Sequence, residues 1–436
     1  MINTYKVNYA HDNHKDFPHV VKFSGGRSSG MLLFILLKNG LLSAERGDVV
    51  VFNNTSAEHS ATYKFVTECK ERCEKDYGIP FFITEFATYE DCAKGVYTRF
   101  STYKLVNEKP FSKHNPDGYH YKGEVFEEVV SKSGYLPNKH KSRTCTLEMK
   151  LKVSNQFLRD WFSNSAQIDR LGHFGKSSRI DEDEIYKLHL RHSGSTPKEI
   201  YLSKKKFSWS RPLSRPEQNF LDFSIVGKSK VTNPMIIDNT LSKVDLEYGE
   251  VEYCNFIGFR YDEPRRLAKM KKRVMEESEN DDLSYVATGM GEHIYVPLCE
   301  LEITNKDVAE FWSNQGWDLD LPNNGEMSNC VYCFMKGNKL LNIAKDEKPL
   351  LGNKDLTPEN ILWWANLEEK YRRDLVAENR EIRSNNKSNP YIGFFGRSSQ
   401  MSYRILDNLK DMSQINKATN IENIEELNSL PCDCTD

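Results

Sequence analysis

The sequence predicts an α/β protein with a mainly parallel, doubly wound sheet and a helical C-terminal region. Three short runs of apolar, mostly β-branched or aromatic residues lie at 20–23, 48–52 and 80–86. The first two runs are each followed by a polar loop and then by a helical pattern. Because this order repeats within the first ninety residues, we expect parallel strands that are joined by crossover helices.

The composition indicates a large cytoplasmic protein. Of its 436 residues, 38% are hydrophobic and 28% are charged, which suits one large domain with insertions or two domains. We expect an α/β domain over 1–345, with an insertion at about 163–240, and a helical region over 346–436. No apolar run reaches the ~20 residues of a membrane span, and the N-terminus lacks a signal-peptide core. The net charge of −3 gives no global basic field for nucleic acid.

Segment 24–30, between the first strand and the first helix, has the composition of a phosphate-binding loop. Gly25 and Gly26 let the backbone turn sharply and approach a ligand closely. The amides and dipole of the following helix, which contains the apolar run 31–37, favour an anion in the loop. The loop also offers hydroxyl groups and a guanidinium, from Ser24, Arg27, Ser28 and Ser29. An ordinary strand–turn–helix connection with a serine cap is the alternative.

Two other strand ends carry polar side chains. Residues 53–58 follow the second strand, and a further apolar strand at 251–260 runs into a charged segment with Arg260 and Arg266. Ligands of doubly wound sheets bind beyond the carboxyl ends of the strands, so these segments are expected to share one crevice with loop 24–30. The arginine forks suit phosphate or sulfate. Alternatively, 53–58 is a plain turn and the arginines pair with the neighbouring acids.

The middle and the end of the chain are less regular. Residues 100–142 are polar, aromatic and basic, and we interpret them as a mobile segment near the site. Basic runs at 139–143 and 204–206 could form a groove for a phosphate backbone. A last strand is expected at 293–298, with a capped helix at 304–312, and a long amphipathic helix from 357 to about 382.

The cysteines give the best metal signal of the sequence. Ten cysteines in a cytosolic chain are expected to be reduced, buried, metal-bound or catalytic. The pair Cys330-x-x-Cys333 can supply half of a tetrahedral metal site or two ligands of an iron–sulfur cluster. Structural Zn²⁺ and buried thiols without a metal are the alternatives.

Together, these motifs resemble those of the phosphoadenosine phosphosulfate (PAPS) reductase-like family of the adenine nucleotide α-hydrolase, or PP-loop ATPase, superfamily. Segment 24–29 is similar to its S-G-G-R-x-S loop, and segment 54–58 to N-T-G-x-E, with Ser56 in place of glycine. Segment 143–150 resembles R-x-C-[CT]-x-x-x-K, and segment 258–266 resembles G-[IF]-R-x-[DE]-E-x-x-R. The resemblance covers most of residues 18–340 through dispersed elements in family order.

The resemblance implies a set of site residues. Nucleotide-binding positions would be Ser24, Gly25, Gly26, Arg27, Ser28, Ser29, Asn54, Thr55, Glu58, Arg143 and Lys150. Arg27, Arg260 and Arg266 would act on the developing charge of the phosphates, with Mg²⁺ as a bridge between them. Ser28 stands where many members have aspartate, so a magnesium role of that aspartate does not carry over.

The resemblance also implies a [4Fe–4S] cluster. The iron–sulfur members place a cysteine pair near the position of Cys145 and a C-x-x-C later in the chain. Here it supplies three ligands, Cys145, Cys330 and Cys333. The fourth would be Cys299, Cys254, His293, a non-protein group or nothing.

Three functions follow as hypotheses. The first is an ATP-using enzyme that releases pyrophosphate and AMP to activate an oxygen, with sulfur as the entering nucleophile, as in thiolation of nucleic acid. Its partners would be a nucleotide, a nucleic-acid acceptor and a sulfur-donor protein; an oligomer would also fit, and no membrane is involved. The second is reduction of PAPS or its unphosphorylated relative, although the C-terminal E-C-G-[LI]-H motif is absent. The third is a non-catalytic nucleotide-binding subunit of a phage–host conflict assembly.

Overall fold

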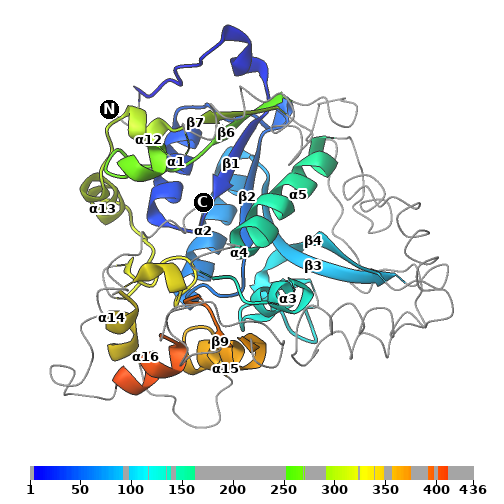
Figure 1. Ribbon diagram of the computed structural model, residues 1–436. Helices are drawn as coiled ribbons and strands as arrows, with labels where there is room; N and C mark the ends of the chain where they lie inside the picture. The colour runs from blue at the N-terminus through cyan, green and yellow to red at the C-terminus, as the bar shows by residue number, and fades with distance from the viewer. Residues whose placement is uncertain are drawn as a thin grey trace.

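The computed structural model describes residues 4–91, 98–115, 117–133, 135–138, 144–162, 252–268, 270, 291–322, 325–337, 339–347, 356–374, 391–396 and 401–410. The expected insertion at 163–240, the two basic runs and Arg143 lie outside these residues. The described chain forms a seven-stranded sheet with helices packed against it, which confirms the α/β class (Figure 1).

The sheet is mainly parallel, as expected. Its strands are β1 (His19–Phe23), β2 (Val49–Asn54), β3 (Phe81–Asp91), β4 (Thr98–Pro110), β5 (Gly118–Tyr119), β6 (Glu252–Phe256) and β7 (Gly291–Tyr295). They lie in the order β5-β4-β3-β2-β1-β6-β7, and only β3 and β4 pair antiparallel. In the centre, Val20 of β1 is in register with Val49 of β2 and Asn255 of β6.

The strand order reverses at β1. From β1 the chain moves through β2 to β3 on one side, and later places β6 and β7 on the other side. In open α/β sheets such a reversal leaves a crevice at the carboxyl ends of the two central strands. The loop that follows β1 therefore lies where this architecture binds ligands.

Two hydrophobic cores cover the two faces of the sheet. One face packs against α1 (Arg27–Lys38), α2 (Ser60–Tyr77) and α13 (Asn305–Ser313), and the other against α3 (Glu124–Ser133) and α5 (Val153–Phe162). Because side chains alternate along a strand, Val21 and Phe23 of β1 enter the first core while Val20 enters the second. Thr304 and Asp307 form the capping box that the sequence predicts for α13.

Short helical segments complete the core region. They are η2 (Asp12–Asp16), η3 (Ala44–Arg46), α4 (Thr144–Thr146), the π-helical η5 (Leu147–Lys152), α12 (Pro297–Glu300) and η8 (Phe334–Lys336). Of these, α4 and η5 lead without a break into α5.

The expectation of a mobile segment at 100–142 needs correction for the residues that the structure describes. The described part of it contains β4, β5 and α3, and Tyr103, Leu105 and Val106 of β4 are buried. Leu105 and Val106 are adjacent in β4 and enter different cores, so the strand is buried on both faces at this point despite its polar neighbours. In Figure 1, β3 and β4 extend together as a long ribbon to one side.

The described C-terminal residues are helical in part and share the second core. α14 (Lys339–Lys345), α15 (Ile361–Tyr371) and α16 (Tyr403–Lys410) gather at one end of the molecule (Figure 1). The helix expected to reach 382 ends at Tyr371, and the chain continues as β8 (Arg373–Asp374), which pairs with β9 (Tyr391–Ile392). The helix ends where the chain begins to pair with β9, and the periodicity of residues 357–382 does not show this pairing. None of the described helices is long and apolar enough to cross a membrane.

Candidate functional site

The loop after β1 is tightly built around Gly25. This residue has φ +78°, and a Cβ there would lie 2.9 Å from Thr62 Cγ2 and 3.0 Å from the Phe52 ring. Positive φ and close packing together require glycine. Ser29 closes the loop from the inside, since its buried hydroxyl donates to the Gly26 carbonyl (2.9 Å) and lies 2.9 Å from Ser24 Oγ. Ser29 therefore shapes the loop rather than facing a ligand.

The first turn of α1 faces outward from this loop. Its N-cap is Gly26, and in the described structure no side chain caps the helix through this residue. Gly26, Arg27 and Ser28 are half-buried. Backbone amides of an uncapped first turn, with the helix dipole behind them, favour an anion.

Arg260 is the predicted arginine that reaches this loop. Its Nη1 donates to Ser28 Oγ (3.0 Å), while its Nε donates to Asp262 (2.8 Å). Gly258 allows this approach, because a Cβ there would lie 3.1 Å from Ser29 Cα and 3.2 Å from Ser29 N. The loop after β6 thus packs against the first turn of α1 and brings a guanidinium to its serine.

The other two predicted arginines are engaged elsewhere. Arg27 forms a two-pronged ion pair with Asp318 (2.8 and 2.7 Å) and donates to the Leu319 carbonyl (2.9 Å). Arg266 donates to Glu263 (2.6 Å) and stacks on the Phe259 ring at 4.3 Å. The alternative that the sequence left open, pairing with nearby acids, therefore describes Arg266, and it also holds for Arg260, which pairs with Asp262. Neither the placement of Arg27 nor that of Arg266 supports a direct role on a phosphate.

A pocket opens beside the loop at the carboxyl ends of β1 and β2. It encloses about 380 Å³ including its mouth, and its lining comprises Lys22, Phe23, Ser24, Asn53, Lys150, Leu151 and Ser154. We call it the strand-end pocket. Sequence reasoning missed Lys22, Asn53 and Ser154. A lysine and an asparagine near the ends of otherwise apolar strands were the available signal.

The polar side chains of the strand-end pocket are held by neighbours. Lys22 pairs with Glu292 of β7 at 2.9 Å, and Asn53 Nδ2 donates to Ser154 Oγ at 2.8 Å. The lining holds two lysines, Lys22 and Lys150, and the charge of Lys22 is balanced by Glu292. This chemistry suits an anionic ligand with hydrogen-bonding edges.

The loop after β2 is built differently, since residues 54–58 are all buried. Asn54 Nδ2 donates to Glu85 and to the His120 carbonyl (both 2.7 Å), and its oxygen accepts the Ser56 amide (2.8 Å). Ser56 itself has φ +58°.

Thr55 and Glu58 continue this buried network. Thr55 Oγ1 donates to Glu58 (2.6 Å), which also accepts the Ala57 amide and the Tyr63 hydroxyl (both 3.1 Å). Burial and the Glu58 carboxylate raise the pKa of Tyr63 well above its usual value, so its hydroxyl remains a donor. The two predicted nucleotide-binding residues thus have partners inside the protein.

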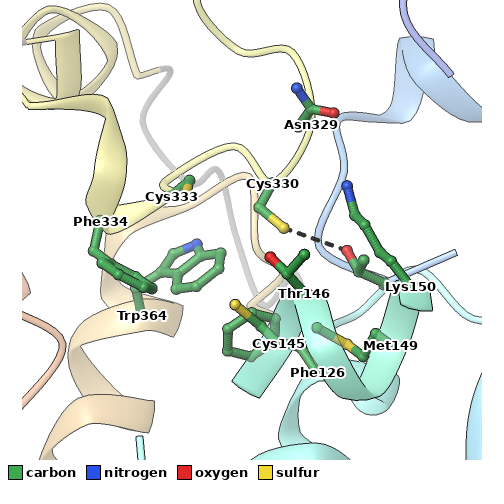
Figure 2. A pocket seen from close by; sticks show the side chains of 11 residues that line it. Phe126, Cys145, Thr146, Met149, Lys150, Asn329, Cys330, Cys333, Phe334 and Trp364 are labelled. Carbon is green, nitrogen blue, oxygen red and sulfur yellow. Dashed lines mark hydrogen bonds between the residues drawn. The ribbon is translucent and has the colours of Figure 1, made fainter. Parts of the chain in front are cut away.

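Three predicted cysteines line a second pocket, which we call the cysteine pocket (Figure 2). It encloses about 420 Å³ including its mouth. Cys145 enters from α4, and Cys330 and Cys333 come from the loop that precedes η8. Phe126, Met149, Phe334 and Trp364 add an apolar wall, and Lys150 lines this pocket as well as the strand-end pocket.

The geometry of the cysteine pocket does not amount to a metal centre. Within the described ranges, no three His, Cys, Asp or Glu side chains lie close enough to hold a metal ion together. The proposed fourth ligands are not in its lining. Cys254 donates to the His14 carbonyl (3.3 Å), and burial raises the pKa of its thiol to about 12; His293 stacks on His14 at 4.1 Å. Cys299 lies on α12, whose Leu298 packs into the other core.

Comparisons with known proteins leave the family open. No family model matches the chain, and no solved structure matches it. A segment of 107 residues is 28% identical to the uncharacterized nin region protein ORF290 of Escherichia phage lambda. That match covers 24% of this chain and 29% of the phage protein.

Proposed function

We propose that this protein binds ATP at the loop after β1 and cleaves it between the α and β phosphates to activate an acceptor, with sulfur as the entering nucleophile. The observation that carries the proposal is the uncapped first turn of α1 at the strand-order reversal, with the Arg260 guanidinium on Ser28. Three features that favour an oligophosphate coincide there: backbone amides, a guanidinium and a pocket lined by lysines.

Each part has a role in the proposal. The amides that follow Gly26 hold the pyrophosphate portion, and Arg260 neutralises charge as the bond to the α-phosphorus breaks. Part of the phosphate chain lies in the strand-end pocket, with Lys22 and Asn53 in its lining. Mg²⁺ accompanies the phosphates as it does in ATP-dependent sites generally.

The reaction is an adenylyl transfer followed by displacement. An acceptor oxygen attacks the α-phosphorus and pyrophosphate leaves; a sulfur nucleophile then displaces AMP. The shared lining residue Lys150 supports a sulfur nucleophile, because it makes the cysteine pocket a neighbour of the strand-end pocket. We assign no step to a [4Fe–4S] cluster or Zn²⁺; if either is held by Cys145, Cys330 and Cys333, its contribution is to carry sulfur or to fix the loop.

The proposal also includes a sulfur source and an acceptor. A persulfide from a donor protein is the simplest sulfur source, and a nucleic acid is the acceptor that the family resemblance suggests. The described part of the chain also contains thiols next to a pocket lined by lysines, which suits the alternative of PAPS or APS reduction.

The test is to incubate the purified full chain with Mg²⁺ and ATP, PAPS or APS and to measure the products. Pyrophosphate and AMP from ATP, dependent on Arg260, are expected. Adenosine 3′,5′-bisphosphate from PAPS, or AMP from APS, in the presence of a thiol reductant would favour the reductase instead. ATP binding without any turnover, with or without nucleic acid, would favour the non-catalytic subunit. Failure to bind any of these nucleotides would overturn the proposal.

A further inference from the structure

Thr55 lies between a buried carboxylate and a cysteine of the second pocket. Its Oγ1 donates to Glu58 at 2.6 Å and is 3.4 Å from Cys330 Sγ; the dashed line that leaves Cys330 in Figure 2 marks the second contact. A hydroxyl carries one proton. Because Thr55 gives that proton to Glu58, the Cys330 thiol is the donor in the contact between Cys330 and Thr55.

The backbone joins the same two segments. Glu58 and Cys330 form an isolated antiparallel bridge, and the Val331 amide donates to the Ala57 carbonyl at 2.9 Å. Both loops are kinked at this junction, since Ser56 has φ +58° and Asn329 has φ +56°. Positive φ at residues other than glycine persists only where the surroundings enforce it, and such positions cluster at functional sites.

The network beyond Thr55 is buried and closely hydrogen-bonded. Glu58 accepts hydrogen bonds from the hydroxyls of Thr55 and Tyr63 and from the Ala57 amide, and only 4% of its surface is exposed. Ser56 Oγ accepts the amide of Val125 at the start of α3. Hydrogen bonds to several neighbours thus hold the loop after β2, and its Thr55 contacts Cys330.

Thr55 also lines the cysteine pocket and is absent from the lining of the strand-end pocket. Neither Glu58 nor Asn54 lines the strand-end pocket. Of the side chains that the sequence motif assigns to a nucleotide, Thr55 is therefore turned toward a thiol, while Asn54 and Glu58 bond to other buried groups.

We propose that Thr55 and Glu58 are positioning residues for Cys330: they fix the direction of its thiol in the cysteine pocket and do not bind the nucleotide. Thr55 and Glu58 thus have their effect through the Cys330 thiol. This assignment does not depend on what the strand-end pocket binds. It makes the loop after β2 a bridge that joins the sheet to the cysteine pocket.

The test compares Thr55→Val, which keeps the shape and removes the hydroxyl, with Thr55→Ser, which keeps the hydroxyl. Metal-free, reduced full-length protein is treated with iodoacetamide, and the alkylation rates of Cys330, Cys333 and Cys145 are followed by peptide mass spectrometry. We expect Thr55→Val to change the Cys330 rate at least threefold, because the thiol loses its fixed direction. Thr55→Ser restores the rate of the unmodified protein, and the Cys145 rate is unchanged in both variants.

Nucleotide affinity provides the second arm, measured by calorimetry with ATP. Thr55→Val is expected to bind ATP within twofold of the unmodified protein. An unchanged Cys330 rate in a folded Thr55→Val protein overturns the assignment, whatever happens to the nucleotide. A tenfold loss of ATP affinity that serine restores overturns it as well. If the unmodified protein binds no ATP at all, the proposed function is wrong. The alkylation rates would still decide whether Thr55 and Glu58 position Cys330.

Discussion

The loops after β1 and β2 both follow parallel strands and both contain small polar residues, yet they are built in opposite ways. In the first, Gly26 and Ser28 are half-buried and the helix behind them lacks a side-chain cap at Gly26. In the second, Asn54, Thr55 and Glu58 are buried and hydrogen-bonded within the protein. The difference teaches that a polar strand end can either present groups to a ligand or connect two parts of the protein. We call 24–30 the presenting loop and 54–58 the connecting loop.

The first test of this comparison concerns the packing beneath the presenting loop. Gly25→Ala places a Cβ at positive φ and against Thr62 and Phe52, so we expect a loss of about 2–5 kcal/mol of unfolding free energy. Gly40→Ala is the matched control, because Gly40 has φ +64° and a Cβ added there would meet no atom within 4 Å. It should lose only about 1–2 kcal/mol. Equal losses in urea unfolding would show that packing does not shape the loop.

The second test compares two adjacent asparagines at the end of β2. Asn54→Ala leaves the Glu85 carboxylate and the Ser56 amide without the hydrogen bonds of this side chain in the interior, so we expect a loss of about 2–4 kcal/mol. Asn53→Ala removes a half-buried side chain that bonds to Thr84 and Ser154, and it should cost about 1–2 kcal/mol. Chemical denaturation measures both. If Asn53→Ala is the more destabilising, the role assigned to the connecting loop is wrong.

The third test separates two arginines next to the presenting loop. Arg260→Ala removes the guanidinium at Ser28, and we expect ATP affinity to fall about 10–100-fold, since hydrogen bonds to charged groups contribute about 1.5–3 kcal/mol. Arg27→Ala breaks a partly exposed ion pair with Asp318 and should change affinity less than about threefold. Calorimetric titration with ATP distinguishes them. A larger loss in Arg27→Ala would restore its predicted role on the phosphates.

The last test uses pH and concerns α15, whose Trp364 lines the cysteine pocket. Burial raises the pKa of Glu368 to about 7, although the amides of Tyr403 and Phe394 favour its charged form. The folded protein then holds a proton that the unfolded chain releases above pH 4.5. Unfolding free energy should therefore fall as pH rises from 4.5 to 7, by at most about 1.4 kcal/mol per pH unit, and then level off.

The matched variant for the pH test is Glu368→Gln, which keeps the size of the side chain and does not titrate. Urea unfolding at pH 5, 6, 7 and 8 should give the unmodified protein a slope that the glutamine variant lacks. The same slope in both proteins would mean that another group is responsible.

Much of the architecture could be predicted from the sequence because it depends on local patterns. The runs at 20–23 and 48–52 are apolar on both faces, and only a strand covered by helices on both sides can bury them. The need for glycine in segment 24–30 was also visible, since Gly25 has a positive φ in the folded protein. By contrast, β4 depends on pairing with β3, and the end of α15 coincides with the pairing of β8 with β9, so periodicity within one segment misled there.

The sequence by itself determined the central parallel strands, the glycine loop at the start of α1 and the cysteine motif at 330–333, because each is written in consecutive residues. Only the tertiary structure decided which polar groups meet: Arg260 with Ser28, Arg27 with Asp318, and Thr55 with Cys330. Each of these pairs is separated by more than 200 residues in the chain. The physical reason is that strand order and close backbone packing, as at Gly258, select the partners of a side chain, and spacing along the sequence does not encode them.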